Sequence, residues 1–146
     1  MKLLLIVGTH PRHRFIIEKV FESFDSVDLI IYQRESLLSF SEPQSDNDHP
    51  LIKKHFEKRL LIEEANYGQK TILDLISQLD RTEINIHKTD LANLNSEITL
   101  KFLAGKKYDL AIFMGPGIIS NTLLETLPAN HINIHLGLSP WYRGSG

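Results

Sequence analysis

The residues best suited to chemistry lie near the end of the chain, in the segment His131-Ile-Asn-Ile-His135. Side chains alternate between the two faces of a β-strand, so His131, Asn133 and His135 would share one face and Ile132 and Ile134 the other. Interior parallel strands are usually apolar on both faces, because helices cover both. A strand that ends with a carboxamide and two imidazoles is therefore a candidate for the ligand-binding edge of an α/β sheet. On the pattern alone, a polar strand end bonded to neighbouring backbone is an equally good interpretation.

A longer motif continues from this segment into the loop that follows. Asn133-x-His135 precedes Leu138-Ser-Pro140 and then Tyr142-Arg143-Gly144. In this pattern the chain resembles the folate-dependent formyltransferases, the family of the glycinamide ribonucleotide, methionyl-tRNA and amino-sugar formyltransferases. The usual form of the family has Pro-Ser directly after the histidine, where this chain has Leu136-Gly137. The resemblance implies a Rossmann-like α/β fold that transfers a formyl group from 10-formyltetrahydrofolate to a primary amine.

Formyl transfer makes chemical demands that Asn133 and His135 can meet. An amine attacks the formyl carbon, and the carbonyl oxygen becomes an oxyanion in a tetrahedral intermediate. A carboxamide and an imidazole two residues apart on one strand face can both donate to that oxygen, and one such donor is typically worth about 3 to 4 kcal/mol in the transition state. An imidazole can also move protons near neutral pH. We predict Asn133 and His135 as the catalytic residues.

A metal site is a further possibility that the histidine spacing raises. His131 and His135 have the four-residue spacing of a metal-binding pair on a helix. In a strand they would be about 13 Å apart, at roughly 3.3 Å per residue, which is too far to share an ion. We predict no metal site and a structural role for His131.

The turn from Thr9 to Arg14 is predicted to bind the acceptor. It follows a short apolar run and opens a helix, so backbone N–H groups and cationic side chains could meet an anion there. In the resemblance, acceptors with phosphates dock at this place, and we favour an amino-sugar nucleotide or another phosphorylated amine. The predicted phosphate-binding residues are Thr9, Arg12, His13 and Arg14. A solvated helix start is an equally good interpretation.

A second loop, Gly115-Pro-Gly-Ile-Ile119, directly follows another apolar run and could form one wall of a pocket for a flat ring. The resemblance implies that it lines the pterin pocket, so the predicted folate-binding residues are Met114, Gly115, Gly117, Ile118 and Ile119. A tight turn that packs Ile118 and Ile119 into the core is the alternative. The resemblance also implies that the loop with Ser139, Tyr142 and Arg143 shapes the cleft.

The composition excludes several classes of protein. The chain has 146 residues and no cysteine, so disulfides, thiolate catalysis and thiolate metal sites are excluded. A formal net charge of -2 provides no basic field for nucleic acid, although a transfer RNA acceptor stays open if a further domain supplies one. The apolar run from Leu3 to Val7 is too short for a signal peptide or a membrane span. We expect a single cytoplasmic domain of undefined oligomeric state.

Apolar periodicity predicts the elements that must position these residues. Strands are expected over residues 2–8, 27–32, 83–87 and 109–114, and from residue 131. Helices are expected over residues 12–24, 51–66, 69–79, 96–105 and 121–127, with a long polar loop over residues 33–50. This alternation is typical of a doubly wound parallel sheet, and we predict the strand order 3-2-1-4-5.

The resemblance also includes a catalytic aspartate on a segment beyond the loop that begins at Trp141. The chain ends at Gly146, so no residue here can take that role. We therefore expect the amino-terminal portion of a formyltransferase catalytic domain, incomplete at its carboxyl end and weak or inactive by itself.

Two other functions fit parts of the sequence. A dinucleotide-binding domain of an oxidoreductase needs Gly-x-Gly-x-x-Gly after the first strand and an acidic residue after the second. The segment from Gly8 to His13 lacks those glycines, while Glu35 loosely meets the second requirement. A non-catalytic binding module that keeps the fold without the reaction is the other alternative.

Overall fold

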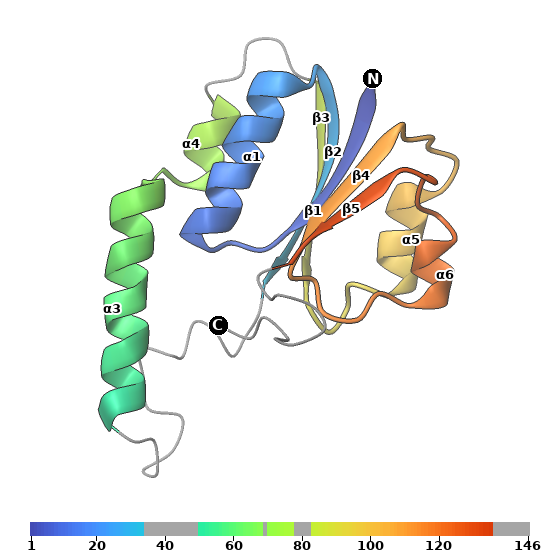
Figure 1. The fold of residues 1–146 in the computed structure, drawn as a ribbon. Helices are drawn as coiled ribbons and strands as arrows, with labels where there is room; N and C mark the ends of the chain where they lie inside the picture. The colour runs from blue at the N-terminus through green and yellow to red at the C-terminus, as the bar shows by residue number, and fades with distance from the viewer. Residues whose placement is uncertain (34–49, 69, 78–82, 136–146) are drawn as a thin grey trace.

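The chain folds into a parallel β-sheet with helices on both faces (Figure 1). The computed structural model describes residues 1–33, 50–68, 70–77 and 83–135. The strands are β1 (Lys2–Val7), β2 (Ser26–Gln33), β3 (Glu83–Asp90), β4 (Leu110–Met114) and β5 (His131–Ile134). The helices are α1 (Pro11–Ser23), α3 (Pro50–Tyr67), α4 (Ile72–Ser77), α5 (Glu97–Leu103) and α6 (Asn121–Leu124). The sheet order β3-β2-β1-β4-β5, parallel throughout, confirms the predicted fold.

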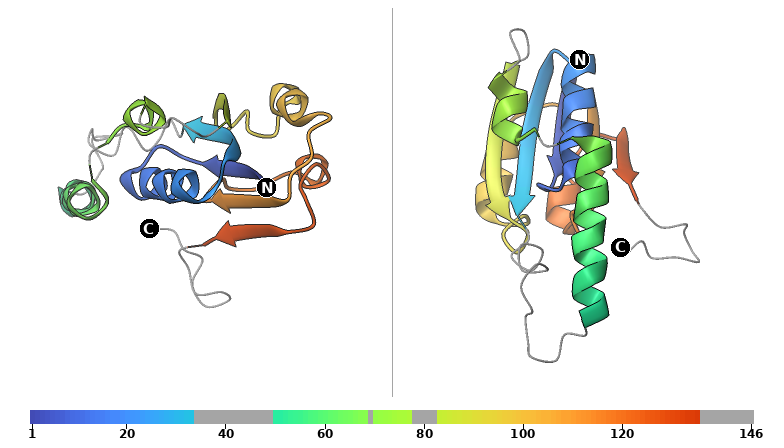
Figure 2. Two further views of the ribbon diagram at one scale, coloured as in Figure 1. Left: turned by 90° about the horizontal axis from the view of Figure 1, so that it is seen from above. Right: turned by 90° about the vertical axis from the view of Figure 1, so that its left-hand side faces the viewer.

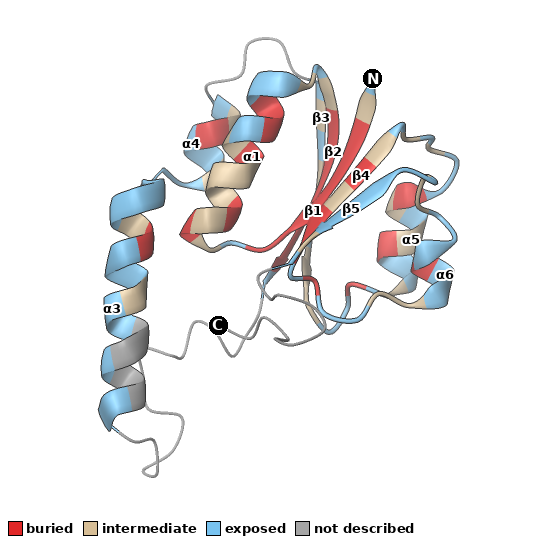
Figure 3. Cartoon of the chain, viewed as in Figure 1, coloured by how far each residue is buried: buried red, intermediate tan, exposed pale blue. Residues whose placement is uncertain are grey.

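The strand β1 lies at the centre of the sheet, and the helices divide between its two faces. The helices α1 and α4 cover one face and α5 and α6 the other (Figures 1 and 2). Leu3, Leu5 and Val7 face α1, whereas Leu4 and Ile6 face α5 and α6, and all five are 0 % exposed. Figure 3 accordingly colours β1 as buried along nearly its whole length, while β5 at the sheet edge is mostly exposed. Burial on both faces explains why every position of this run is apolar.

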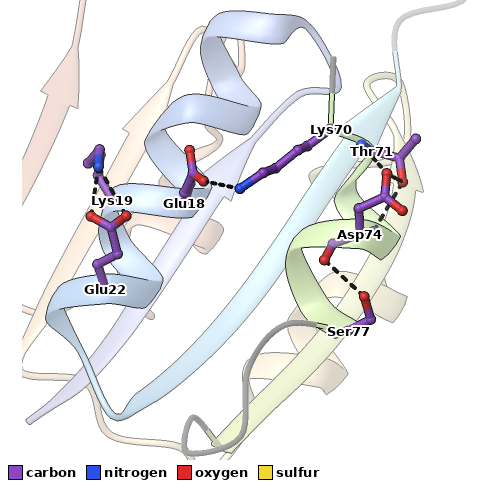
Figure 4. A network of polar contacts seen from close by, with 7 residues as sticks. All are labelled: Glu18, Lys19, Glu22, Lys70, Thr71, Asp74 and Ser77. Atoms are coloured by element: carbon purple, nitrogen blue, oxygen red, sulfur yellow. Dashed lines mark hydrogen bonds and ion pairs between the residues drawn. The ribbon is translucent and has the colours of Figure 1, made fainter. Parts of the chain in front are cut away.

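Two polar contacts fasten the segment that leads into α4 to α1, and Figure 4 shows the one between Lys70 and Glu18. Lys70 Nζ lies 2.7 Å from Glu18 Oε1, and Arg14 Nη1 donates to the Lys70 carbonyl oxygen at 2.9 Å. Thr71 and Asp74 form a capping box at the start of α4, because each side chain accepts a hydrogen bond from the backbone N–H of the other. Hydrogen bonds from Thr71 also hold the pKa of Asp74 below its usual value. The helix predicted over residues 69–79 thus begins at Ile72, while residues 69, 78 and 79 lie outside the described part of the chain.

The helix α3 differs most from the expected packing. Ile52, Phe56 and Leu60 recur at helical spacing along it; Leu60 is 45 % exposed, and the side chains of Ile52 and Phe56 lie outside the part that the structure describes. Leu61 and Ile62 are exposed as well, and the helix extends beyond the carboxyl edge of the sheet (Figure 1). The helix predicted over residues 51–66 is therefore present, but Leu60 is not part of a buried face. No described helix, α3 included, is long and apolar enough to cross a membrane.

A buried carboxylate joins three strands at the amino-terminal half of the sheet. Asp28 on β2 is 0 % exposed and accepts hydrogen bonds from Asn85 Nδ2 at 2.8 Å and from Tyr108 Oη at 2.7 Å. Lys106 Nζ lies 2.8 Å and Lys2 Nζ 3.5 Å from its oxygens. Burial acts to raise the pKa of Asp28, but the hydrogen bonds from Lys106, Tyr108 and Asn85 outweigh it and hold the pKa below its usual value. Burial and the bond to Asp28 raise the pKa of Tyr108.

We expect the Asp28→Asn substitution to lower the free energy of unfolding by about 2 to 3 kcal/mol at pH 7, because it leaves partly buried ammonium groups without their carboxylate. The folded pKa of Asp28 lies below the unfolded one, so its contribution is complete above about pH 4 and is lost as the pH falls through the folded pKa. Urea unfolding of both proteins from pH 7 toward pH 3 measures this difference. The matched control is Asp25→Asn at an exposed carboxylate, expected to stay within about 0.5 kcal/mol of the parent. A difference for Asp28→Asn that is the same at every pH would contradict the assignment.

Candidate functional site at the carboxyl edge of the sheet

The strand order identifies where a ligand should bind. After β1 the chain passes through α1, on one face of the sheet, to β2 on one side of β1. After β4 it passes through α6, on the other face, to β5 at the opposite edge of the sheet. In open parallel sheets the loops diverge at such a point, and the crevice between them is the usual ligand site. The two loops in question are the turn after β1, from Gly8 to His10, and the loop after β4, from Gly115 to Ser120. These belong to the two segments predicted to bind acceptor and folate, so the fold brings both to one edge.

His13 connects the turn after β1 to the sheet. Its side chain is buried, and Nδ1 accepts a hydrogen bond from the backbone N–H of Gly8 at 2.7 Å. The ring lies edge-on to Tyr32, with centroids 6.3 Å apart and an interplanar angle of 77°. A Cβ at Gly8 would lie 3.1 Å from His13 Nδ1 and 3.2 Å from Tyr32 Cε2, so a side chain at residue 8 would push against both rings. His13 is therefore turned into the protein rather than toward solvent.

Tyr32 carries the connection from β2 to β4. Its Oη donates to the carbonyl oxygen of Met114 at 2.7 Å, and because β1 lies between these two strands, the side chain passes over the end of β1. Gly115 follows with a φ of 64°, and a Cβ there would lie 3.2 Å from Tyr32 Oη. Sequence reasoning treated Tyr32 only as the end of a strand. An aromatic hydroxyl at the carboxyl end of a buried apolar run is the signal that could have drawn attention to it.

The other residues predicted to bind phosphate point in different directions. Arg12 Nη1 lies 3.5 Å from Glu63 Oε1 on α3, an oxygen that Arg59 Nε also contacts at 2.9 Å. Burial, with the nearby charge of Arg59, lowers the pKa of Arg12. Arg14 binds the Lys70 carbonyl oxygen, as described above, and Thr9 is exposed.

Three backbone N–H groups around this turn are also engaged. Those of His13 and Arg14 donate to the His10 carbonyl oxygen at 2.9 and 3.0 Å, and that of Gly8 donates to His13. The four residues predicted to bind phosphate do not converge on one point, and their contacts are those of a packed helix start. Their role in phosphate binding stays a prediction.

The two residues predicted to be catalytic, Asn133 and His135, lie where β5 ends. The register pairs Phe113 with Asn133 and Met114 with Ile134, so Asn133 shares the face of Phe113 while Ile134 packs into the core beneath α1. Asn133 and His135 are both exposed. The alternation expected from the sequence therefore holds at Asn133 and Ile134, and the amide stands next to the strand whose loop was predicted to hold the folate.

His131 makes packing contacts at the other end of β5. Its ring stacks on Phe113 with centroids 5.9 Å apart, and Nδ1 lies 3.0 Å from the carbonyl oxygen of Pro128. Ile132 beside it is 52 % exposed, since β5 is the edge strand of the sheet.

An amide that the sequence did not single out holds the loop after β4. Asn95 Nδ2 donates to the Ile118 carbonyl oxygen at 3.0 Å, and Asn95 Oδ1 accepts from the Ser120 N–H at 2.8 Å. The side chain of Ile118 is 90 % exposed, whereas Ile119 packs against the core beneath α5 and α6. Nothing local in the polar segment around Asn95 could have indicated this contact, because its partners lie on a distant loop.

The remaining predicted folate residues are placed as follows. The Met114 side chain is buried in the core beneath α1, so only its backbone faces the loop. Gly115 and Gly117 both have positive φ, at 64° and 75°, and both are exposed. The predicted cleft residues Ser139, Tyr142 and Arg143 lie outside the described residues. Among those that are described, no three His, Asp or Glu side chains gather as a metal site would require.

Comparisons with protein-family models, with curated proteins and with solved structures find no match to this chain. The argument for function therefore depends on the site itself.

We expect Gly115→Ala to destabilise the protein more than Gly105→Ala. Both glycines have positive φ, 64° and 72°, which costs an alanine about 1 to 2 kcal/mol, but only Gly115 has a neighbour in the way. The contact with Tyr32 Oη should add about 1 kcal/mol at Gly115. Urea unfolding measures both differences.

The Tyr32→Phe background separates the two causes, because it removes the hydroxyl oxygen that an alanine at residue 115 would meet. In that background Gly115→Ala should cost no more than Gly105→Ala. If its cost is unchanged by Tyr32→Phe, the close approach is not what restricts residue 115.

Proposed function

We propose that this protein takes part in transferring a formyl group from 10-formyltetrahydrofolate to a primary amine, with Asn133 and His135 as the reacting side chains. The observation that best supports the proposal is their position. Both are exposed at the carboxyl end of β5, and this strand pairs with β4, which leads into the Gly115–Ile119 loop. A carboxamide and an imidazole exposed at the edge where open α/β sheets hold ligands are suited to stabilising a carbonyl oxygen.

Each side chain has a separate role in the proposal. Asn133 donates an amide N–H to the formyl oxygen as negative charge develops there. His135 donates to the same oxygen through one ring nitrogen, and its other nitrogen can relay the proton that the attacking amine loses. Ile118, 90 % exposed beside the end of β4, offers an apolar surface on which the flat ring of a reduced folate can pack.

The acceptor is proposed to be an amino-sugar nucleotide or a similar phosphorylated amine. The amine follows from the chemistry of the catalytic pair. The phosphate has less support, because Arg12, His13 and Arg14 are engaged with Glu63, Gly8 and Lys70.

The dinucleotide-binding alternative meets an obstacle at Gly8. Glycine-rich dinucleotide sites need a bare backbone close to the pyrophosphate. Here the N–H of Gly8 is already donated to His13, and the rings of His13 and Tyr32 occupy the space beside its Cα. We therefore favour formyl transfer over hydride transfer.

The test combines binding with turnover. We expect the chain to bind 5-formyltetrahydrofolate, an unreactive analogue of the donor, in calorimetric titration, and to show no comparable binding of NAD. Where transfer to a panel of primary amines is measurable, Asn133→Ala and His135→Ala should each lower kcat about 100- to 1,000-fold with a much smaller change in folate affinity. The matched control is Asn130→Ala, which removes an exposed amide just before the same strand.

Three outcomes separate the alternatives. Binding of NAD without binding of the folate would reject the proposal in favour of a dinucleotide site. Folate binding with any transfer unaffected by Asn133→Ala and by His135→Ala would support the non-catalytic module. An Asn133→Ala variant as fast as Asn130→Ala would remove Asn133 from the mechanism.

A further inference from the structure

His13 is a titratable side chain held between the turn after β1 and the loop after β4. It is 6 % exposed, and Nδ1 accepts from the Gly8 N–H at 2.7 Å. A Cβ on Gly115 would lie 3.8 Å from His13 Cε1, so the ring also lies beside the β4 loop. Both sides of the divergence point of the sheet are thus within reach of this one imidazole.

The hydrogen bond from Gly8 determines the protonation state of the ring. A backbone N–H can only donate, so Nδ1 must present its lone pair, and the neutral imidazole carries its proton on Nε2. A second proton would go onto Nδ1. Two N–H groups would then face each other across 2.7 Å in a buried place, and the hydrogen bond could not persist.

We propose that His13 is a positioning residue: as a neutral imidazole it holds the turn after β1 against Tyr32 and the β4 loop, and on taking a second proton it releases that turn. The inference goes beyond the formyl-transfer proposal and does not depend on it. It makes the geometry of this edge pH-sensitive, with the turn fastened at higher pH and released as His13 titrates.

Among the described residues, groups beside the ring come from the turn before α1, from β2 and from the β4 loop. His10, in the turn before α1, has its ring centroid 6.0 Å from that of His13, and Tyr32 on β2 has its centroid at 6.3 Å. The β4 loop contributes the uncharged Gly115. Arg12, the neighbour of His13 on α1, is directed to Glu63 on α3.

His131 provides a natural comparison within the same protein. Its Nδ1 lies 3.0 Å from the Pro128 carbonyl oxygen, which can only accept, so this nitrogen already carries a proton. Nδ1 is thus a donor in His131 and an acceptor in His13. Of the two contacts, the one made by His13 requires an unprotonated Nδ1.

The experiment is nuclear magnetic resonance on the full 146-residue chain, labelled with 15N, from pH 8 to pH 5. At pH 8 we expect the 15N shift of His13 Nδ1 to be that of an unprotonated acceptor, and the Gly8 amide to be protected from exchange. As His13 titrates, the protection factor of the Gly8 amide should fall about tenfold or more, because one buried hydrogen bond is lost. The far-ultraviolet circular dichroism spectrum should stay constant over this range.

Two variants distinguish positioning from general packing. In His13→Asn the side-chain oxygen can take the place of Nδ1 as acceptor and cannot titrate, so Gly8 should stay protected at both pH values. In His13→Leu, which fills similar space without an acceptor, protection should be lost at both. His131→Asn is the matched control and should leave the pH response of Gly8 unchanged.

Several results would overturn the inference. One is a Gly8 amide that keeps its protection while His13 becomes doubly protonated. Another is a His13 that takes no second proton before the chain unfolds. Loss of protection in His13→Asn at pH 8 would also count against it, and if His13→Leu does not fold, the parent and His13→Asn still decide the question.

Discussion

The burial of β1 on both faces is the constraint on which the rest of this structure depends. Leu3 to Val7 are 0 % exposed, enclosed by β2 and β4 at the sides and by helices above and below. Both neighbours of β1 are parallel to it, and right-handed crossovers on its two sides place the connecting helices on opposite faces. The turn after β1 and the loop after β4 are then brought together. The candidate site is thus a consequence of how the apolar core is enclosed.

The fold was predictable from sequence because its signal is carried by runs of residues. The apolar run from Leu3 to Val7, the stop at Gly8 and the alternation of strand and helix together indicate a doubly wound sheet. The packing of α3 was not predictable in the same way. The spacing of apolar residues around Leu60 identifies a helix, but it does not tell which part of the protein will pack against those residues. Here α3 extends beyond the edge of the sheet, and Leu60 is exposed.

The candidate site was predictable in its place but not in its contacts. Asn133 and His135 could be assigned to the carboxyl end of the last strand because strand alternation is a local property. The direction of His13 could not, since it depends on Gly8, on Tyr32 from another strand and on Gly115 from a third. Cationic residues at a helix start indicate an anion site only while they face solvent. Here Arg12 forms an ion pair with Glu63 on α3. The spacing of residues in the sequence could not predict this pair, because the two side chains come from different helices.

The side chains at the carboxyl edge also determine from where a ligand can approach. Over the end of β1 the space is taken by His13 and Tyr32, which are 6 % and 2 % exposed. Over the ends of β4 and β5, the exposed side chains among the described residues include Ile118, Asn133 and His135. Within the described part of this edge, the side of β4 and β5 therefore offers a ligand an apolar side chain and two hydrogen-bonding side chains. That combination suits a flat heterocycle that carries a carbonyl group better than a pyrophosphate, which would need the backbone at Gly8 that His13 already occupies.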